Sequence, residues 1–139
     1  MIAKCKKVKL DYLSLQIINS NMEEFLQVGE VFHVYGLKVY KQISYIHIYT
    51  RHHLFEVPLE LFEIVSNQIP HIWKIKIKST IEVTLWPDIF YSEWFFDNLS
   101  EDELREVGWF SELRKEIEGQ TGQGLKNEED ESEKSKQIK

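Results

Sequence analysis

A chain of 139 residues, of which 42% are hydrophobic and 13% aromatic, has enough apolar side chains for one core and fits a single domain. Its formal net charge of −6 disfavours a nucleic-acid-binding protein, because such proteins gather Lys and Arg to neutralise phosphates. The single cysteine, Cys5, excludes an intramolecular disulfide, and no apolar run approaches the roughly 20 residues that cross a bilayer. We therefore expect a cytoplasmic protein without a membrane partner.

Between residues 31 and 86 apolar and polar side chains alternate with a period of two, which is typical of strands with one solvated face. The segments are VFHVYGLKVY, ISYIHIYT, LFEV, IWKIKIK and IEVTLW. The separators Lys41-Gln42, His52-His53 and Ser79-Thr80 are too short for a parallel crossover, so the pattern predicts an antiparallel meander. Gly36 lies inside the first segment, where it predicts a bulge or sharp coil that curls the sheet.

Two segments of this region need separate interpretation. PLELFEIV, beginning at Pro58, predicts a short turn of helix or an extended link that leads into a strand. In IWKIKIK the side chains of Lys74, Lys76 and Lys78 alternate with those of Ile75 and Ile77. We expect the lysines on the solvated face and the isoleucines to be buried.

After Pro87 the period of the pattern lengthens. IFYSEWFFDN predicts a short helix or an irregular arm, and Ser100 followed by Glu103 has the spacing of a capping box at the start of a helix. Apolar residues then recur at helical intervals up to Ile117. Gly108 leaves open a break between two shorter helices, since glycine costs about 1 kcal/mol within a helix.

These elements predict an α+β, mainly β fold. We expect a curled antiparallel sheet of five or six strands, or a small Src-homology-three-like barrel, with a C-terminal helical extension. Residues 1–119 form the single domain, in which 25–86 are β-rich and 87–118 are a helical, acidic and aromatic arm. Residues 120–139 contain no aromatic side chain and many charges, so they are predicted to be a disordered charged tail.

The charge is unevenly divided along the chain. Residues 1–80 carry ten Lys and Arg against seven Asp and Glu, whereas residues 82–118 carry eleven Asp and Glu against three Lys and Arg. A surface that combines carboxylates with large rings attracts and holds a basic partner. The predicted partner-binding residues are Asp88, Tyr91, Glu93, Trp94, Asp97, Glu101, Asp102 and Glu106. As an alternative for the rings, Trp86, Phe90, Trp94 and Phe95 would only dock the arm onto the sheet, with the carboxylates as a solvated face.

The sequence predicts no metal site, no cofactor and no catalytic residue. The five histidines, His33, His47, His52, His53 and His71, lack the spacing of a metal site. Candidates for acid–base chemistry are His47 or His52 with Glu56, and Glu93 with Asp97 and Tyr91. No nucleophile elbow, phosphate loop or dinucleotide fingerprint accompanies them, so we do not expect an enzyme.

The stretch 25–73 resembles a group of small bacterial toxin-immunity or immunity-like proteins. The motifs that carry the resemblance are VGEVFHVYGLKVY, ISYIHIYT, VPLELFEIV and QIPHIW, with WPDIFYSEWFFDN downstream. The resemblance implies a small curled β-barrel with a helical extension, and a neutralised protein partner rather than a substrate. It carries over no catalytic residue.

We therefore predict a non-enzymatic inhibitor, an immunity protein that neutralises a basic bacterial toxin through the acidic and aromatic C-terminal surface. The alternative is a small barrel-type module that binds nucleic acid or peptide on a strand face bearing Lys and Tyr. That face would comprise Lys74, Lys76, Lys78, Tyr45 and Tyr49. Self-association of the protein is left open.

Overall fold

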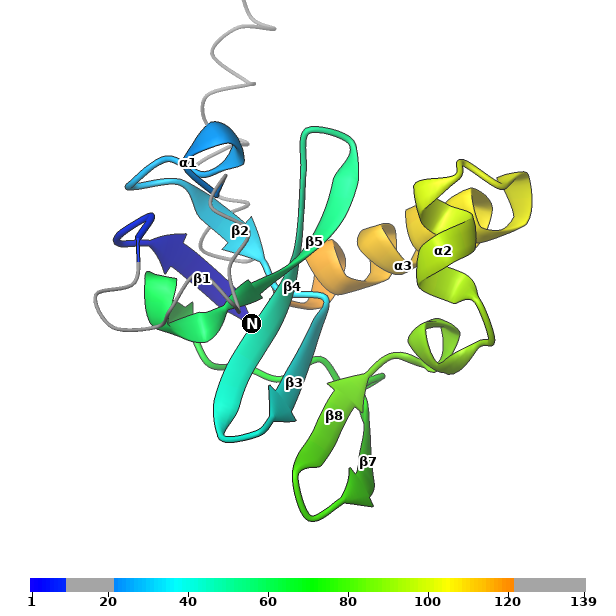
Figure 1. The fold of residues 1–139 in the computed structure, drawn as a ribbon. Helices are drawn as coiled ribbons and strands as arrows, with labels where there is room; N and C mark the ends of the chain where they lie inside the picture. Colours follow the sequence, from blue (N-terminus) through cyan, green and yellow to red (C-terminus); the bar gives the residue numbers. More distant parts are fainter. Residues whose placement is uncertain (10–21, 122–139) are drawn as a thin grey trace, which may run out of the picture.

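The computed structural model describes residues 1–9 and 22–121, and within them the chain forms two antiparallel sheets followed by a helical arm (Figure 1). The smaller sheet has the order β2-β1-β6 and the larger sheet the order β5-β4-β3-β8-β7. The strands are β1 (Ile2–Cys5), β2 (Val31–His33), β3 (Gly36–Tyr40), β4 (Ile43–Thr50), β5 (His53–Pro58), β6 (Phe62–Ser66), β7 (Lys74–Ser79) and β8 (Glu82–Trp86). The helical elements are α1 (Met22–Phe25), η1 (Leu59–Leu61), η2 (Asp88–Tyr91), α2 (Phe95–Ser100) and α3 (Leu104–Thr121).

The predicted fold class is confirmed: the described residues are mainly strand, antiparallel throughout, with a C-terminal helical extension. Neither sheet closes on itself, so the arrangement is that of curled sheets and not of a closed barrel. The described residues form eight strands, more than the five or six expected, because β1, β2 and β6 make a second sheet.

Two-residue turns connect the strands of the larger sheet. Lys41 and Gln42 have φ of 50° and 69°, and Arg51 and His52 have φ of 51° and 65°, as type I′ hairpin turns require. The second turn is therefore Arg51-His52 and not His52-His53, since His53 already pairs with Thr50.

The segment predicted as one strand over residues 31–40 is divided between the two sheets. β2 pairs with β1, and β3 pairs with β4 and β8 without a register shift, so the bulge predicted at Gly36 is not present. A glycine is required at position 36 because three aromatic side chains lie close to its Cα atom. A Cβ atom at Gly36 would lie 2.8 Å from Trp86 Cδ1, 3.0 Å from Phe90 Cε2 and 3.1 Å from His47 Cδ2.

Two hydrophobic cores lie on the two faces of the larger sheet. The first fills the space between the sheets and includes Ala3, Phe32, Ile46, Ile48 and Leu61. The second lies between the larger sheet and the arm and consists of Tyr35, Trp86, Phe90, Phe95, Phe110, Leu113 and Ile117. Alternation along β4 places Ile46 and Ile48 in the first core and turns His47 between them toward the second.

The prediction for PLELFEIV is confirmed, since η1 leads directly into β6. In the arm, α3 continues through Gly108, and the break comes earlier, between α2 and α3. Ser100 does not cap α3, because it is the last residue of α2 and its hydroxyl donates to the Asp97 carbonyl at 2.7 Å. α3 also continues beyond residue 119, and the rest of the predicted tail, from residue 122, lies outside the described residues.

The expectation of buried isoleucines in β7 was wrong. Ile75 is 63% exposed and Ile77 is 75% exposed. β7 is the outermost strand of the larger sheet, and the first core does not extend to this edge.

Candidate functional site

The second core forms the base on which the arm is built. His47 lies among three rings, with centroid separations of 5.5 Å to Trp86, 5.4 Å to Phe90 and 5.4 Å to Phe96. Trp86, Phe90 and Phe95 are buried, which confirms for these three rings the alternative that they dock the arm onto the sheet. Trp94 differs from them, because its side chain is 65% exposed.

His47 is neutral at physiological pH. Burial lowers its pKa to about 3, and the nearby charge of Lys38 acts in the same direction. Its Nε2 lies 3.7 Å from Glu56 Oε2, beyond hydrogen-bonding distance, while Lys38 Nζ pairs with Glu56 Oε1 at 2.7 Å. The contact between His47 and Glu56 is therefore not an ion pair. The suggested acid–base pair is adjacent in space, but its imidazole is enclosed by rings, with 2% of the residue exposed.

Five of the eight predicted partner-binding residues gather around α2, and we call them the α2 surface. They are Glu93, Trp94, Asp97, Glu101 and Asp102, and all five are exposed. Helical spacing places Trp94, Asp97 and Glu101 on one side of α2, opposite the side that packs Phe95 and Leu99 against the second core. The five residues therefore present one ring and four carboxylates to solvent.

The backbone at Trp94 is strained. Its φ is 64° and its ψ 15°, in the left-handed region that costs a bulky residue about 1–2 kcal/mol. This conformation turns the chain from η2 into α2, and it leaves the indole on the outside while the next residue, Phe95, enters the core. Asp102 also has a positive φ, 59°, and ends α2, where the Glu103 amide donates to the Asn98 carbonyl at 3.0 Å.

The other three predicted residues have different surroundings. Asp88 is exposed but pairs with Lys74 at 3.0 Å. The Tyr91 hydroxyl donates to the Lys74 carbonyl at 2.9 Å and bonds to Thr84 Oγ1 at 2.7 Å, so this side chain joins η2 to the larger sheet. These contacts make both residues part of the junction between the sheet and the arm.

Glu106 is 1% exposed, so its carboxylate is not available to a partner. Arg105 donates to Glu106 Oε2 at 2.9 and 3.2 Å, and the Asn98 side chain donates to the same oxygen at 3.2 Å. The hydrogen bonds from Arg105 hold the pKa of Glu106 below its usual value. Because Asn98 belongs to α2 and Glu106 to α3, this carboxylate links the two helices.

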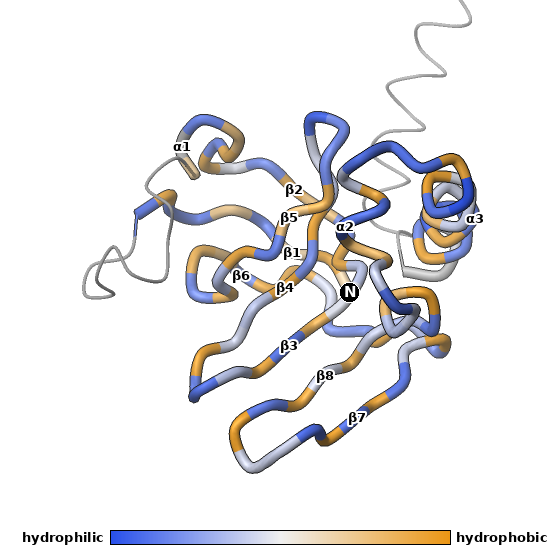
Figure 2. Tube along the Cα trace, turned by 45° about the vertical axis from the view of Figure 1, so that its right-hand side comes forward, coloured by the Kyte–Doolittle hydropathy of each residue, from blue (hydrophilic) through white to orange (hydrophobic). Residues whose placement is uncertain are grey.

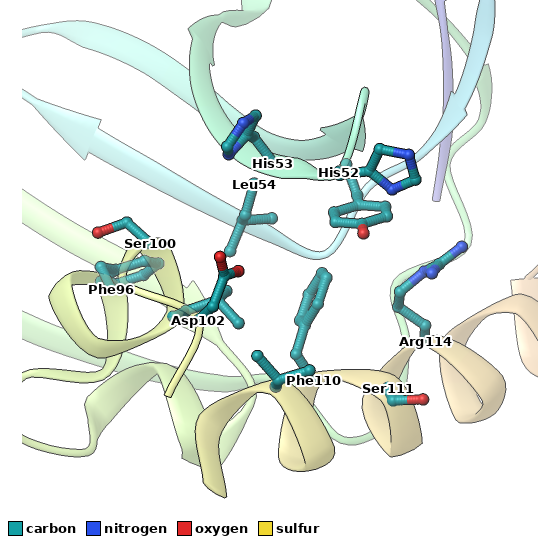
Figure 3. Close-up of a pocket in the computed structure, with 12 residues that line it drawn as sticks. His52, His53, Leu54, Phe96, Ser100, Asp102, Phe110, Ser111 and Arg114 are labelled. Carbon is teal, nitrogen blue, oxygen red and sulfur yellow. The ribbon is translucent and has the colours of Figure 1, made fainter. Parts of the chain in front are cut away.

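A cleft of about 390 Å³ opens beside the α2 surface, between the turn of the β4–β5 hairpin and the two helices (Figure 3). His52, His53 and Leu54 line it from the hairpin. On the helical side, Asp102 and Arg114 lie on either side of Phe110 (Figure 3). The Arg114 guanidinium lies 4.3 Å from the centroid of the Tyr49 ring. Sequence patterns did not single out Arg114, because the walls of the cleft come from segments far apart in the chain.

The lysine-bearing strand face of the alternative prediction is formed in part. Lys76 Nζ lies 4.1 Å from the centroid of the Tyr91 ring, and Lys38 Nζ lies 5.5 Å from that of Tyr45. Tyr49 points to the same side of β4 as Tyr45, but its ring lies 4.3 Å from the Arg114 guanidinium and 5.2 Å from the Phe110 ring, so α3 covers this end of the face. Two of its three lysines, Lys74 and Lys78, already pair with carboxylates of the same chain, as does the neighbouring Lys38.

Comparisons with protein-family models, with curated proteins and with solved structures found no match to this chain. The resemblance to immunity proteins therefore stays a prediction. In the described residues no three His, Cys, Asp or Glu side chains come together in a group that could hold a metal ion. None of the described helices combines the length and the apolar character needed to span a membrane.

Proposed function

We propose that the protein is a non-enzymatic binding protein of the bacterial cytoplasm, an immunity-like inhibitor that neutralises a basic protein toxin. The observation that carries this proposal is Trp94, a large ring that is 65% exposed and shares one side of α2 with Asp97 and Glu101. The site of contact is the α2 surface.

The chemistry of the α2 surface suits a cationic protein. Tryptophan is among the residues that most often dominate the energy of protein interfaces. Of the residues that the structure describes, none forms an ion pair with Glu93, Asp97, Glu101 or Asp102, so their charges are open to a partner. Four unpaired carboxylates, one on α2 and three in the residues flanking it, attract Lys and Arg over a distance and increase the rate of encounter.

The rigidity of the second core supports the same proposal. Phe95 and Phe96 pack on Phe90 with centroid separations of 5.4 and 5.1 Å, and Glu106 joins α2 to α3. A surface held in place by its own core loses little conformational entropy when a partner binds. The α2 surface is therefore suited to tight inhibition and not only to transient contact.

A charge-reversal experiment tests the proposal. An immunity factor is expected to be encoded beside its toxin, so the first candidate partner is the product of the neighbouring reading frame. Association of the two purified proteins would be followed by stopped-flow fluorescence over a range of NaCl concentrations. In the test variant Glu93, Asp97 and Glu101 become Lys, while Asp102 is kept because it ends α2. We expect the association rate at low salt to fall by about tenfold or more, and its salt dependence to flatten.

The control has the same change in net charge at other places. Glu24, Glu63 and Glu116 are exposed on α1, β6 and α3, and changing all three to Lys should leave most of the association rate intact. An equal loss in both variants, or a wild-type rate that does not vary with salt, would contradict the proposed mechanism. No binding of the neighbouring gene product, or of any basic protein, would contradict the function.

The contribution of the exposed ring is tested separately. Trp94→Ala should weaken the complex by at least about thirtyfold, the loss typical of a central aromatic anchor. Trp109→Ala is the matched control, because Trp109 is also exposed but lies on α3, where its ring stacks on Arg105. Equal affinities of the two variants would place the interface away from α2.

A further inference from the structure

We propose that β7 is a second docking site, where an extended segment of a protein partner, with acidic and apolar side chains in alternation, adds as a further strand to the larger sheet. This inference concerns a different surface from α2 and does not depend on the proposed inhibition. It rests on the backbone, the side chains and the charges of one edge strand.

The backbone of β7 is open on one side. In the strand order β5-β4-β3-β8-β7 it has a single strand neighbour, β8. Every second backbone N–H and C=O group of β7 therefore points away from the sheet, and no strand formed by residues 1–9 or 22–121 pairs with it there. Residues 74–77 pair with β8 in a regular register, and the register shifts only between Ile77 and Ser79. An added strand would find a straight edge along these four residues.

Hydrophilic and hydrophobic residues alternate along β7 (Figure 2), and because successive side chains of a strand point to opposite sides, its two faces differ in chemistry. All six residues of β7 are exposed, including Ile75 at 63% and Ile77 at 75%. On the same face Ile77 lies opposite Val83, which in turn lies opposite Val39, so the apolar row extends across three strands. Lysines commonly protect an edge strand from pairing, but protection does not explain two exposed isoleucines beside them.

The lysines of the other face are available to acidic side chains. Within the described part of the chain, no carboxylate pairs with Lys76, whose Nζ rests 4.1 Å from the centroid of the Tyr91 ring. Lys74 pairs with Asp88 at 3.0 Å and Lys78 with Glu82 at 3.4 Å. The side chains of Lys74, Asp88 and Lys78 are all exposed to solvent. Exposed ion pairs contribute little in water, so a partner's carboxylates can replace them at low cost.

These charges also decide between possible occupants. Antiparallel pairing of β7 with a second copy of itself would bring the lysines of both copies onto one face, where they repel. Single-stranded nucleic acid would use the lysines and Tyr91, but it would leave Ile75, Ile77 and the edge amides without a partner. A strand with carboxylates opposite the lysines and apolar side chains opposite the isoleucines would pair with the charges, the apolar row and the open backbone edge of β7 together.

Peptide binding to the full-length protein tests this proposal. The probe is a short fluorescein-labelled peptide of alternating glutamate and valine, followed by fluorescence anisotropy. Two control peptides should each bind at least about tenfold more weakly. One has the same composition with its glutamates and valines in separate blocks, and the other is the alternating peptide N-methylated on alternate amides. Binding should weaken as salt is added, since three of the contacts are ionic.

Variants of β7 assign the binding to this strand. The triple variant Lys74→Glu, Lys76→Glu and Lys78→Glu should lose the acidic peptide and gain an alternating lysine and valine peptide. The double variant Ile75→Ser and Ile77→Ser should weaken binding by about tenfold, because two apolar cross-strand contacts are removed. Ile69→Ser is the control, because Ile69 is 52% exposed but precedes β7.

Several results would overturn the proposal. The block peptide or the N-methylated peptide would bind as tightly as the alternating peptide. Single-stranded RNA would bind more tightly than the acidic peptide. Analytical ultracentrifugation would show a dimer of the protein that becomes tighter in the triple Lys→Glu variant. Because β7 is fully exposed, these substitutions should not change the unfolding temperature, and circular dichroism would verify that each variant is folded.

Discussion

Replacing His47 with Phe should remove a defined part of the protein's sensitivity to acid. The imidazole is 2% exposed and lies among Trp86, Phe90 and Phe96, so its protonated form would have to be buried without water. The charged groups nearest to it are Lys38 and Glu56, which pair with each other and together add little net charge. A phenyl ring fits the same apolar surroundings and does not titrate.

The magnitude follows from the difference between the two pKa values. The pKa of His47 is about 3 in the folded protein and 6.5 in an ordinary unfolded chain. Between these values the unfolded chain binds a proton that the folded protein does not, so the free energy of unfolding falls as the pH falls, by about 1.4 kcal/mol per pH unit. Between pH 7 and pH 4.5 this one group should cost the wild type roughly 2 to 3 kcal/mol.

Urea unfolding at several pH values between 7 and 4.5 measures this effect. Carboxylates also contribute to acid sensitivity, but they do so equally in both proteins, so the difference between wild type and His47→Phe isolates the histidine. The larger Phe side chain also changes the stability at pH 7, and this offset does not depend on pH. The reasoning is refuted if the difference in free energy of unfolding stays constant from pH 7 to pH 4.5.

Four further substitutions test the packing of the arm. Gly36→Ala should lower the free energy of unfolding by about 1–3 kcal/mol, because its Cβ would meet three rings. At Gly108 an added Cβ atom would meet nothing within 4 Å, so Gly108→Ala should raise the free energy of unfolding by about 0.5–1 kcal/mol. Urea unfolding measures the effects of both alanine substitutions. Glu106→Gln should lower the unfolding temperature and speed amide hydrogen exchange in α2, since the charged hydrogen bonds from Arg105 are weakened. Trp94→Gly should raise the unfolding temperature or leave it unchanged, because glycine relieves about 1 kcal/mol of left-handed strain.

Each of these expectations has a contrary result. Equal effects of alanine at positions 36 and 108 would mean that the rings around Gly36 shift freely. Unchanged exchange in α2 after Glu106→Gln would mean that the buried carboxylate does not hold the two helices together. A large loss of stability in Trp94→Gly would give Trp94 a structural role and would weaken the case for a binding anchor.

The sequence was most informative where the evidence is local. Period-two alternation over residues 31–86 correctly indicated antiparallel strands, and the short separator at Lys41-Gln42 correctly indicated a tight hairpin. For PLELFEIV the sequence predicted a short turn of helix or an extended link leading into a strand, and the structure has the first of these. Such features depend on neighbouring residues, because backbone conformation and side-chain direction are set within a few positions.

The candidate site could be predicted only in part for the same reason. Composition located the acidic and aromatic segment, and five of its eight chosen residues do gather on the α2 surface. Composition could not distinguish Glu106, which is buried, from Glu101, which is exposed, although both lie in the same charged stretch. Burial depends on which side of a helix meets the core, and the turn at Asp102 changes that direction between the two residues.

By itself the amino-acid sequence determined the kind of fold, the places of the turns to within one residue and the acidic character of the arm, since these follow from local periodicity and charge. Only the tertiary structure decided that His47 is enclosed by rings while Ile75 and Ile77 are open to solvent. An alternating pattern predicts that the two faces of a strand differ, but it does not predict which element covers each face. That depends on the order of the strands in the sheet, and β7, which a simple meander would have protected with further strands, is left at the edge.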